Sequence, residues 1–329
     1  MKYSFVIPVY NRPDEVDELL ESLCTQTMSD FEVLIVEDGS SVPCHEVVEK
    51  YNSRLDVKYF VKPNSGPGQT RNYGVERASG EYVLILDSDV VLPSTYLDEV
   101  ENELSSSPCD AFGGPDRAHS SFTPMQKAIN YAMTSFFTTG GIRGGKRKMD
   151  KFYPRSFNSG VRTDVYRALG GFSEMRFGED IDFSTRIFAG GYSCRLFPEA
   201  WVWHKRRTDL RKFFKQVHNS GIARINLTKR HPGTLKLVHL LPAVFTVGCA
   251  VLLLCAPLCV WSLLPLLLFS LIIFVDGTLA ERSVGVGFRA AAASFVQLLG
   301  YGTGFLRAWW KRCVLGKGEF DAFRKNFYK

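Results

Sequence analysis

The stretch Tyr82-Val83-Leu84-Ile85-Leu86-Asp87-Ser88-Asp89 decides the fold that the sequence predicts. Its first five residues are apolar and rich in branched side chains, which is the pattern of a buried β-strand. Two carboxylates, Asp87 and Asp89, follow directly. Paired carboxylates at a strand end can hold a divalent cation, which in turn can bind and neutralise a diphosphate. Taken alone, the pair is equally compatible with a solvated turn.

Strands and helices alternate around this stretch. Short β-rich runs occupy residues 5–9, 31–36 and 57–61, and segments with helical spacing lie between them. This order predicts an α/β fold with a mostly parallel, Rossmann-like sheet that has helices on both faces. Ligands of such sheets bind beyond the carboxyl ends of the strands.

Polar loops follow the strands at those ends. Asp38 can accept a hydrogen bond from a base or a ribose hydroxyl, Gly39 lets a backbone approach closely, and Arg71 can meet a phosphate at a helix start. Each of these residues also suits an ordinary turn or helix start. The glycines Gly66, Gly68 and Gly74 do not form a dinucleotide-binding fingerprint or a P-loop, so those readings lose support.

Five motifs follow one another along the chain: Phe5-Val6-Ile7-Pro8-Val9-Tyr10-Asn11-Arg12, Val36-Glu37-Asp38-Gly39-Ser40, Gly66 through Arg71-Asn72, Gly80-Glu81-Tyr82 and Asp87-Ser88-Asp89. In this order, they resemble the pattern of glycosyltransferase family 2, whose members have the GT-A fold and invert the anomeric configuration. The resemblance covers roughly residues 3–205 and is specific as a series, although each motif alone is weak.

The resemblance implies a nucleotide-sugar donor, bound through its nucleoside and its diphosphate. The nucleobase and ribose are expected at Asp38 and the first loop, and the diphosphate and a divalent metal, Mg²⁺ or Mn²⁺, at Asp87 and Asp89. The residues expected to bind the donor are Pro8, Tyr10, Asn11, Arg12, Asp38, Gly39, Arg71, Asp87 and Ser88, and those expected at the metal are Asp89, Asp87 and His204.

A second acidic group, Glu179-Asp180-Ile181-Asp182, follows Gly178 ahead of a helical segment. Acids at a helix N-terminus are stabilised by the helix dipole, so a helix start alone accounts for them. The resembled family has its Glu-Asp catalytic pair here, which implies Asp180 as the general base and Glu179 as a positioning group. In an inverting transfer, such a base removes the proton of the attacking acceptor hydroxyl. Asp182 is compatible with a structural role.

Three further features leave alternatives open. His204 ends a strand-like run and is either a metal or diphosphate contact, as in the family, or part of a basic patch with Lys205. Asn158 is either a sugar contact or a turn residue. The glycine-rich basic segment 140–148 is either a loop that closes over substrate or an ordinary surface loop.

Charge and hydropathy change along the chain. Residues 1–203 contain 21 Lys and Arg against 29 Asp and Glu, whereas residues 204–236 contain ten basic residues and one acid. An acidic first half argues against a nucleic-acid partner, and a basic segment beside apolar sequence argues for anionic membrane lipids.

Residues 235–280 contain two long apolar runs around Pro257, which predicts a transmembrane helical hairpin with Trp261 near one interface.

The third apolar stretch, residues 288–310, contains Gln297 and is flanked by Arg289 and Arg307. We expect it to lie at the membrane interface, with a third span as the alternative. The expected domains are therefore a catalytic domain at 1–204, a basic juxtamembrane segment at 205–234, the hairpin at 235–280, and an interfacial or third membrane helix with a basic cytoplasmic tail at 281–329.

The expected location is the bacterial inner membrane, with the catalytic domain in the cytoplasm. Residues 3–9 are too short and strand-like for a signal sequence, and the eight cysteines form no C-x-x-C pair.

The favoured activity is transfer of a sugar from a UDP- or GDP-sugar to a lipid-linked glycan. A polyprenyl-phosphate glycosyltransferase is the alternative, although its Asp-x-Asp-Leu-Gln signature differs from Asp87–Val91 here. A processive synthase and a non-catalytic nucleotide-sugar-binding scaffold are less favoured.

Overall fold

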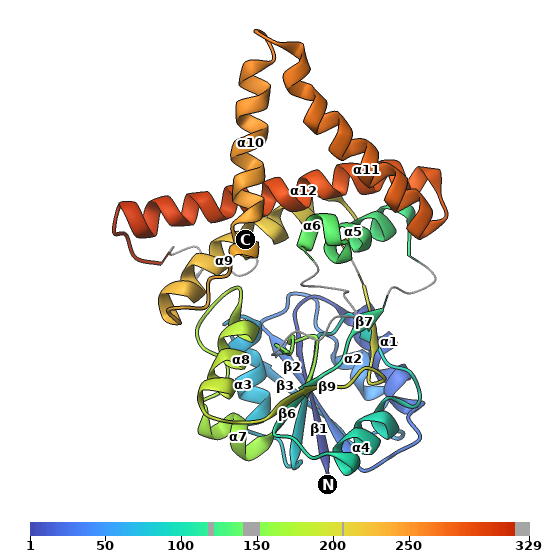
Figure 1. The fold of residues 1–329 in the computed structure, drawn as a ribbon. Coiled ribbons are helices and arrows are strands. Elements are labelled where there is room, and N and C mark those ends of the chain that lie inside the picture. The colour runs from blue at the N-terminus through green and yellow to red at the C-terminus, as the bar shows by residue number, and fades with distance from the viewer. Residues whose placement is uncertain (118–121, 141–151, 206, 320–329) are drawn as a thin grey trace. The chain divides into compact units, whose positions relative to one another are not determined.

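The chain folds into two compact units, an α/β unit and a helical unit (Figure 1). The computed structural model describes residues 1–117, 122–140, 152–205 and 207–319. Residues 1–117 and 152–205 belong to the α/β unit, and residues 122–140 and 207–319 belong to the helical unit. The segment 122–140 therefore packs with the C-terminal helices, although it lies inside the range 1–204 expected for the catalytic domain.

A seven-stranded sheet in the order β3-β2-β1-β4-β8-β6-β9 forms the centre of the α/β unit. Only the pairs β4/β8 and β6/β8 are antiparallel, so the sheet is mostly parallel, as predicted. A smaller sheet has the order β5-β10-β7. The strands are β1 (Tyr3–Val9), β2 (Phe31–Asp38), β3 (Val57–Lys62), β4 (Tyr82–Leu86), β5 (Val90–Val91), β6 (Ala111–Gly113), β7 (Asp116–Arg117), β8 (Asn158–Arg162), β9 (Cys194–Leu196) and β10 (Val202–His204).

Helices cover both faces of the large sheet, as the alternating pattern predicts. Phe5 and Ile7 pack into one core cluster with α1 (Pro13–Cys24) and α4 (Tyr96–Ser106). Val6 packs into the other cluster with α7 (Thr163–Ala168) and α8 (Glu179–Ala189). Because both faces are buried, the central strands are apolar at nearly every position. The helices of this unit are α1 (Pro13–Cys24), α2 (His45–Glu49), α3 (Pro67–Val75), α4 (Tyr96–Ser106), α7 (Thr163–Ala168) and α8 (Glu179–Ala189).

The helical unit is built around one long helix, α12 (Val284–Trp309). It packs against α5 (Pro124–Thr134), α9 (Leu210–Arg230), α10 (Leu241–Cys255) and α11 (Leu264–Glu281), with the short α6 (Phe136–Thr139) beside α5. A Cβ on Gly304 of α12 would lie 2.0 Å from the His218 carbonyl oxygen of α9. Glycine at this position lets the two helix backbones touch.

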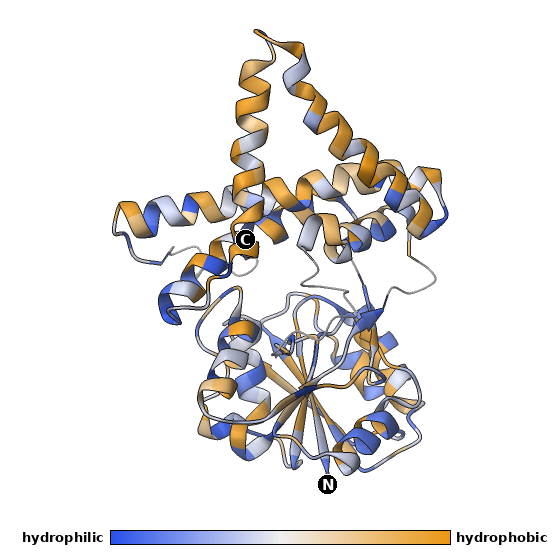
Figure 2. Cartoon of the chain, viewed as in Figure 1, coloured by the Kyte–Doolittle hydropathy of each residue, from blue (hydrophilic) through white to orange (hydrophobic). Residues whose placement is uncertain are grey.

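Three helical segments of the described chain are long and apolar enough to cross a membrane: Leu237–Cys255, Val260–Glu281 and Val284–Val314. The α10 and α11 helices are mostly apolar (Figure 2). At their tip Leu258 is 91% exposed and Trp261 74% exposed. An exposed apolar surface of this kind suits lipid better than water, so these helices are consistent with the C-terminal membrane helices that the sequence predicts.

Candidate functional site

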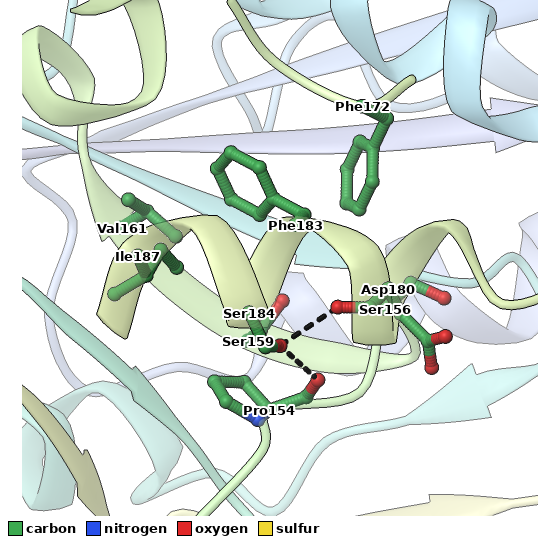
Figure 3. A pocket seen from close by; sticks show the side chains of 9 residues that line it. All are labelled: Pro154, Ser156, Ser159, Val161, Phe172, Asp180, Phe183, Ser184 and Ile187. Carbon is green, nitrogen blue, oxygen red and sulfur yellow. Dashed lines mark hydrogen bonds between the residues drawn. The ribbon is translucent and has the colours of Figure 1, made fainter. Parts of the chain in front are cut away.

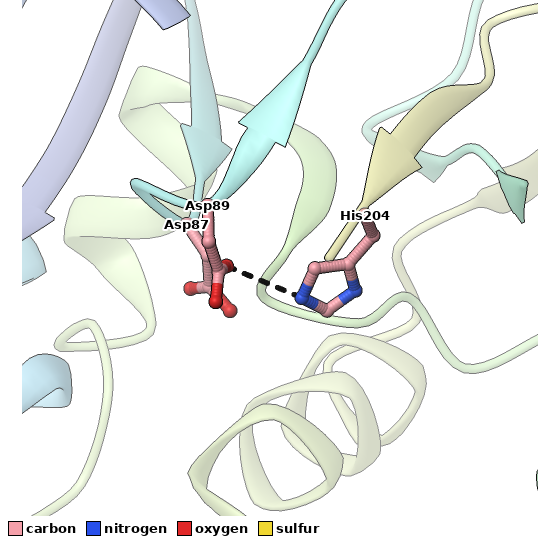
Figure 4. Close-up of side chains that lie close together, drawn as sticks. All are labelled: Asp87, Asp89 and His204. Atoms are coloured by element: carbon pink, nitrogen blue, oxygen red, sulfur yellow. Dashed lines mark ion pairs between the residues drawn. The ribbon is translucent and has the colours of Figure 1, made fainter. Parts of the chain in front are cut away.

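Asp87, Asp89 and His204 come together at the end of strand β4 (Figure 4). β4 ends at Leu86 and β10 ends at His204, so two strands of different sheets deliver these side chains to one place. One ligand atom from each residue lies within 4.8 Å of the others. Two carboxylate oxygens and an imidazole nitrogen form a donor set that suits Mn²⁺ or Mg²⁺.

Positive groups hold the Asp89 carboxylate in this cluster. Arg12 Nη1 donates to Asp89 Oδ2 over 2.7 Å, and His204 Nε2 lies 3.3 Å from Asp89 Oδ1. Burial by itself lowers the pKa of His204, but Asp89 and Asp116 outweigh it and raise the pKa to about 9. Without a metal, the imidazole is therefore an imidazolium that neutralises the acids, and a divalent cation would take over that role.

Arg71 joins this cluster to the second acidic group. Arg71 is the fifth residue of α3 and is 2% exposed. Its Nη2 donates to Asp87 Oδ1 over 2.6 Å. Its Nη1 donates to Glu179 Oε1 over 3.2 Å. A single buried guanidinium thus fixes the spacing between the acids after β4 and the acids that start α8.

Glu179 and Asp180 occupy the first turn of α8, directly after Gly178 in the left-handed region at φ 85°. Burial and the neighbouring Asp180 raise the pKa of Glu179 to about 7, although Arg71 opposes the rise. Asp180 is held by Arg155, whose Nη1 lies 3.2 Å from Asp180 Oδ2, and by the Ile181 amide. Asp182 binds Ser173 and Arg186, which gives it the structural role that the sequence allowed.

A small cavity lies beside Asp180, under α8 (Figure 3). Phe172, Phe183 and Ile187 form its apolar wall, and its volume of about 10 Å³ has room for roughly one water molecule. A sugar does not fit there. The side chains of Asp87 and Asp180 are partly exposed outside this cavity.

Asp38 ends β2 and is 1% exposed. Its carboxylate accepts hydrogen bonds from the backbone amides of Ser65 and Gly66, each over 2.8 Å, and from Lys62 Nζ over 2.8 Å. With these three donors and almost no exposed surface, the Asp38 carboxylate holds the loop at Ser65 and Gly66 against the end of β2. At Gly39, φ is 72° and a Cβ would lie 2.8 Å from the Asn64 amide nitrogen, which explains the glycine.

The first loop follows β1. Pro8 lies within that strand, and Asn11, at φ 53°, accepts from the backbone amides of Ser41 and Val42 through Oδ1. Ser88 is buried between the two metal-site acids. The structure thus pairs Arg12 with Asp89 and Arg71 with Asp87. The binding roles stay predictions for Pro8, Tyr10, Asn11, Arg12, Asp38, Gly39, Arg71, Asp87 and Ser88.

Asn158 has a structural role instead of contacting a sugar. It is fully buried in β8, where its amide accepts from the Tyr96 hydroxyl and donates to the Ala200 carbonyl. Two residues that the sequence analysis did not single out, Arg155 and Asp116, face Asp180 and His204. No local motif marks them, because only the fold brings them to their partners. Most of the segment 140–148 lies outside the described residues.

The chain is similar to known glycosyltransferases. Residues 4–170 match the family model described as glycosyl transferase family 2. The chain is 42% identical over 93 residues to the poly(ribitol-phosphate) β-N-acetylglucosaminyltransferase TarS of Staphylococcus aureus, covering 27% of this chain and 16% of TarS. It is 28% identical over 313 residues to the pre-mycofactocin glycosyltransferase of Mycobacterium tuberculosis, covering 91% of this chain and 60% of that protein.

Among solved structures, the mannosyltransferase PcManGT from Pyrobaculum calidifontis, in complex with GDP-Man and Mn²⁺, matches with a TM-score of 0.65. That match covers 90% of this chain and 87% of PcManGT at 16% identity, so it supports the fold. The chain spans 13% to 22% of the length of the rickettsial relatives that it matches. Because the family model covers residues 4–170 of the 329, the chain belongs to glycosyl transferase family 2.

Proposed function

We propose that this protein is a membrane-anchored, metal-dependent, inverting glycosyltransferase. It transfers a sugar from a UDP- or GDP-sugar to a hydroxyl of a lipid-linked glycan, in the synthesis of a cell-surface polysaccharide or glycolipid. The observation that carries the proposal is the bridge from Asp87 through Arg71 to Glu179, next to Asp180. It holds a candidate diphosphate site and a candidate base at a defined separation, as a displacement between two bound substrates requires.

The donor diphosphate binds at Asp87, Asp89 and His204. Their clustered oxygen and nitrogen atoms fit a divalent cation, which when bound would neutralise the charge of the departing diphosphate. Arg12 lies against Asp89 and offers further positive charge at the same place. The nucleoside binds along the first loop and at the end of β2, where Asp38 fixes the neighbouring loop through the Ser65 and Gly66 amides.

Asp180 acts as the general base. It takes the proton from the acceptor hydroxyl while that oxygen attacks the anomeric carbon on the side opposite the leaving nucleoside diphosphate. A single displacement of this kind inverts the anomeric configuration. Arg155 and the Ile181 amide hold the Asp180 carboxylate in one orientation, and Glu179 orients Arg71.

The membrane segments point to a lipid-borne acceptor. In this proposal α10 and α11 form the hairpin that anchors the protein, and α12, which packs along α9, lies at the interface. Phe288 and Trp310 of this region are 66% and 54% exposed and suit the headgroup boundary. The described basic residues of segment 204–236 would face the anionic lipids of the bacterial inner membrane, with the catalytic domain in the cytoplasm.

A panel of nucleotide sugars tests the proposal. Full-length protein in detergent, supplied with Mn²⁺, is incubated with each donor and with polyprenyl-phosphate or polyprenyl-diphosphate-linked sugar acceptors. We expect transfer to a sugar hydroxyl, lost in Asp89→Ala. Transfer to bare polyprenyl phosphate alone would instead establish a polyprenyl-phosphate glycosyltransferase. Absence of transfer and of donor hydrolysis with every nucleotide sugar would favour a non-catalytic scaffold.

A further inference from the structure

The two ring nitrogens of His204 face different partners. Nε2 points toward Asp89, as Figure 4 shows, at 3.3 Å from Oδ1. Nδ1 is buried without a hydrogen bond in the described structure, and Asp116 Oδ2 lies 3.7 Å from it. The Phe157 ring stacks on the imidazole with centroids 4.8 Å apart. The ring is thus confined on one face and flanked by a carboxylate at each nitrogen.

The backbone around Asp116 is held closely against the strand that bears His204. β7 and β10 pair in parallel with Val202 opposite Asp116, and the Val202 amide donates to the Pro115 carbonyl over 3.1 Å. A Cβ on Gly114 would lie 1.7 Å from the Ala200 carbonyl oxygen, so only glycine allows this approach. Since side chains alternate along a strand, Asp116 and His204 lie on the same face of the small sheet.

The arrangement matches a known property of metal-binding histidines. Such a histidine commonly donates its second ring N–H to a carboxylate, which sets the tautomer and makes the ligating nitrogen more basic. We propose that Asp116 is a positioning residue that accepts the Nδ1 proton of His204, so that Nε2 presents its lone pair to a divalent cation between Asp87 and Asp89. This inference rests on the metal site of the proposed function. It requires the gap between Nδ1 and Asp116 to shorten to hydrogen-bond length when the cation binds.

The same small sheet provides a matched control. Glu199, just before β10, pairs with Arg117, the residue after Asp116, over 3.6 Å. Arg117 points to the opposite face of the sheet from Asp116, and Glu199 is largely exposed. Glu199→Gln therefore removes a nearby carboxylate without touching His204.

The test measures Mn²⁺ binding to full-length protein in detergent, from the EPR signal of free Mn²⁺. We expect Asp116→Ala to raise the Kd for Mn²⁺ by about 10- to 100-fold. Asp116→Asn keeps an acceptor oxygen and should recover part of that affinity. Glu199→Gln should leave the Kd within about twofold, because it changes only an exposed ion pair. In a His204→Ala background, neither change at Asp116 should weaken binding further, because its effect acts through the imidazole.

Two results would overturn the inference while the proposed transferase stands. One is an unchanged Kd in both Asp116 variants of a protein that binds Mn²⁺ and transfers sugar. The other is an equal loss of affinity with and without His204. If Asp116→Ala aggregates, the Kd for Mn²⁺ is compared among Asp116→Asn, His204→Ala and the double variant. An unchanged Kd in Asp116→Asn, or an equal loss of affinity with and without His204, would then overturn the inference. A wild-type protein that binds no Mn²⁺ would refute both the positioning role and the metal dependence.

Discussion

Arg71 donates a hydrogen bond from Nη1 to Glu179 across 3.2 Å, although the two residues are 108 positions apart in the chain. The other arm of the guanidinium holds Asp87. This pairing is the structural link between the candidate metal site and the candidate base, and it makes Arg71 sensitive to even a conservative change.

Arg71→Lys should lower the transfer rate by about 100-fold, because an ammonium group cannot hold both carboxylates in a fixed fork. Steady-state rates with a saturating donor measure the effect. Arg77→Lys, just beyond the end of α3, is the matched control and should stay near wild type. Equal rates for Arg71→Lys and wild type would show that the bridge has no part in catalysis.

Asp180→Asn should reduce transfer by about 10³-fold, the range expected for a missing general base. Glu179→Gln should retain more activity, because Glu179 acts through Arg71. Single-turnover transfer measures both. The reverse ranking, with Asp180→Asn near normal and Glu179→Gln inactive, would exchange their roles.

The rate should rise with pH through about 7, because the pKa of Glu179 is raised to about 7 by burial and by Asp180. Below that pH Glu179 is protonated and neutral and holds Arg71 more weakly; above it the ion pair is complete. Glu179→Gln should abolish this inflection. At every pH, the rate of the variant should equal the lower rate that the wild-type protein shows below pH 7. A persistent inflection in the variant would assign it to another group.

Glu32→Gln should lower the stability of the α/β unit by about 2 kcal/mol at pH 7. Burial alone would raise the pKa of Glu32, but hydrogen bonds from Lys58, Ser4 and Ser79 outweigh it and lower the pKa to about 2. The carboxylate therefore stabilises the fold above pH 4.5, and this contribution disappears as the pH falls toward 2. Thermal unfolding across that range measures it, with exposed Glu46→Gln as the control.

Gly304→Ala should destabilise the helical unit by about 1–3 kcal/mol, because its Cβ would press on the α9 backbone at His218. Gly248→Ala on α10 is the control, since its Cβ meets nothing within 4 Å. That change should be neutral or slightly stabilising, as alanine favours helix. Thermal unfolding in one detergent compares the two, and equal effects would mean that the close contact of α9 and α12 is unimportant.

A reporter fused to the C-terminus should be found in the cytoplasm if α12 lies at the interface and only α10 and α11 cross the membrane. Lys311 and Arg312 lie just beyond the end of α12 at Trp309, and the positive-inside rule keeps them on the cytoplasmic side. Protease protection in spheroplasts measures this. A reporter on the outer side would establish α12 as a third span.

Local patterns in the sequence were enough to predict the α/β fold. The apolar run Tyr82–Leu86 and the polar loops after each strand lie close together in the chain, and period and turn chemistry are local properties. The same holds for the apolar helices at the C-terminus, whose length and composition show directly in the sequence. The candidate acids Asp87, Asp89 and Asp180 could be named for the same reason, through their motifs.

The pairings between these groups depended on the tertiary structure. Arg155 reaches Asp180 and Asp116 reaches His204 only because distant strands and helices converge, and neither residue lies in a motif. The helix α5 belongs to the helical unit because it packs with remote C-terminal helices. Asn158 is buried and has a structural role, because burial also depends on neighbours that are remote in the chain. By itself, the sequence determined the order of the elements and the chemistry at the strand ends. Only the fold decided which charged groups face one another, because those distances are set by packing between remote segments.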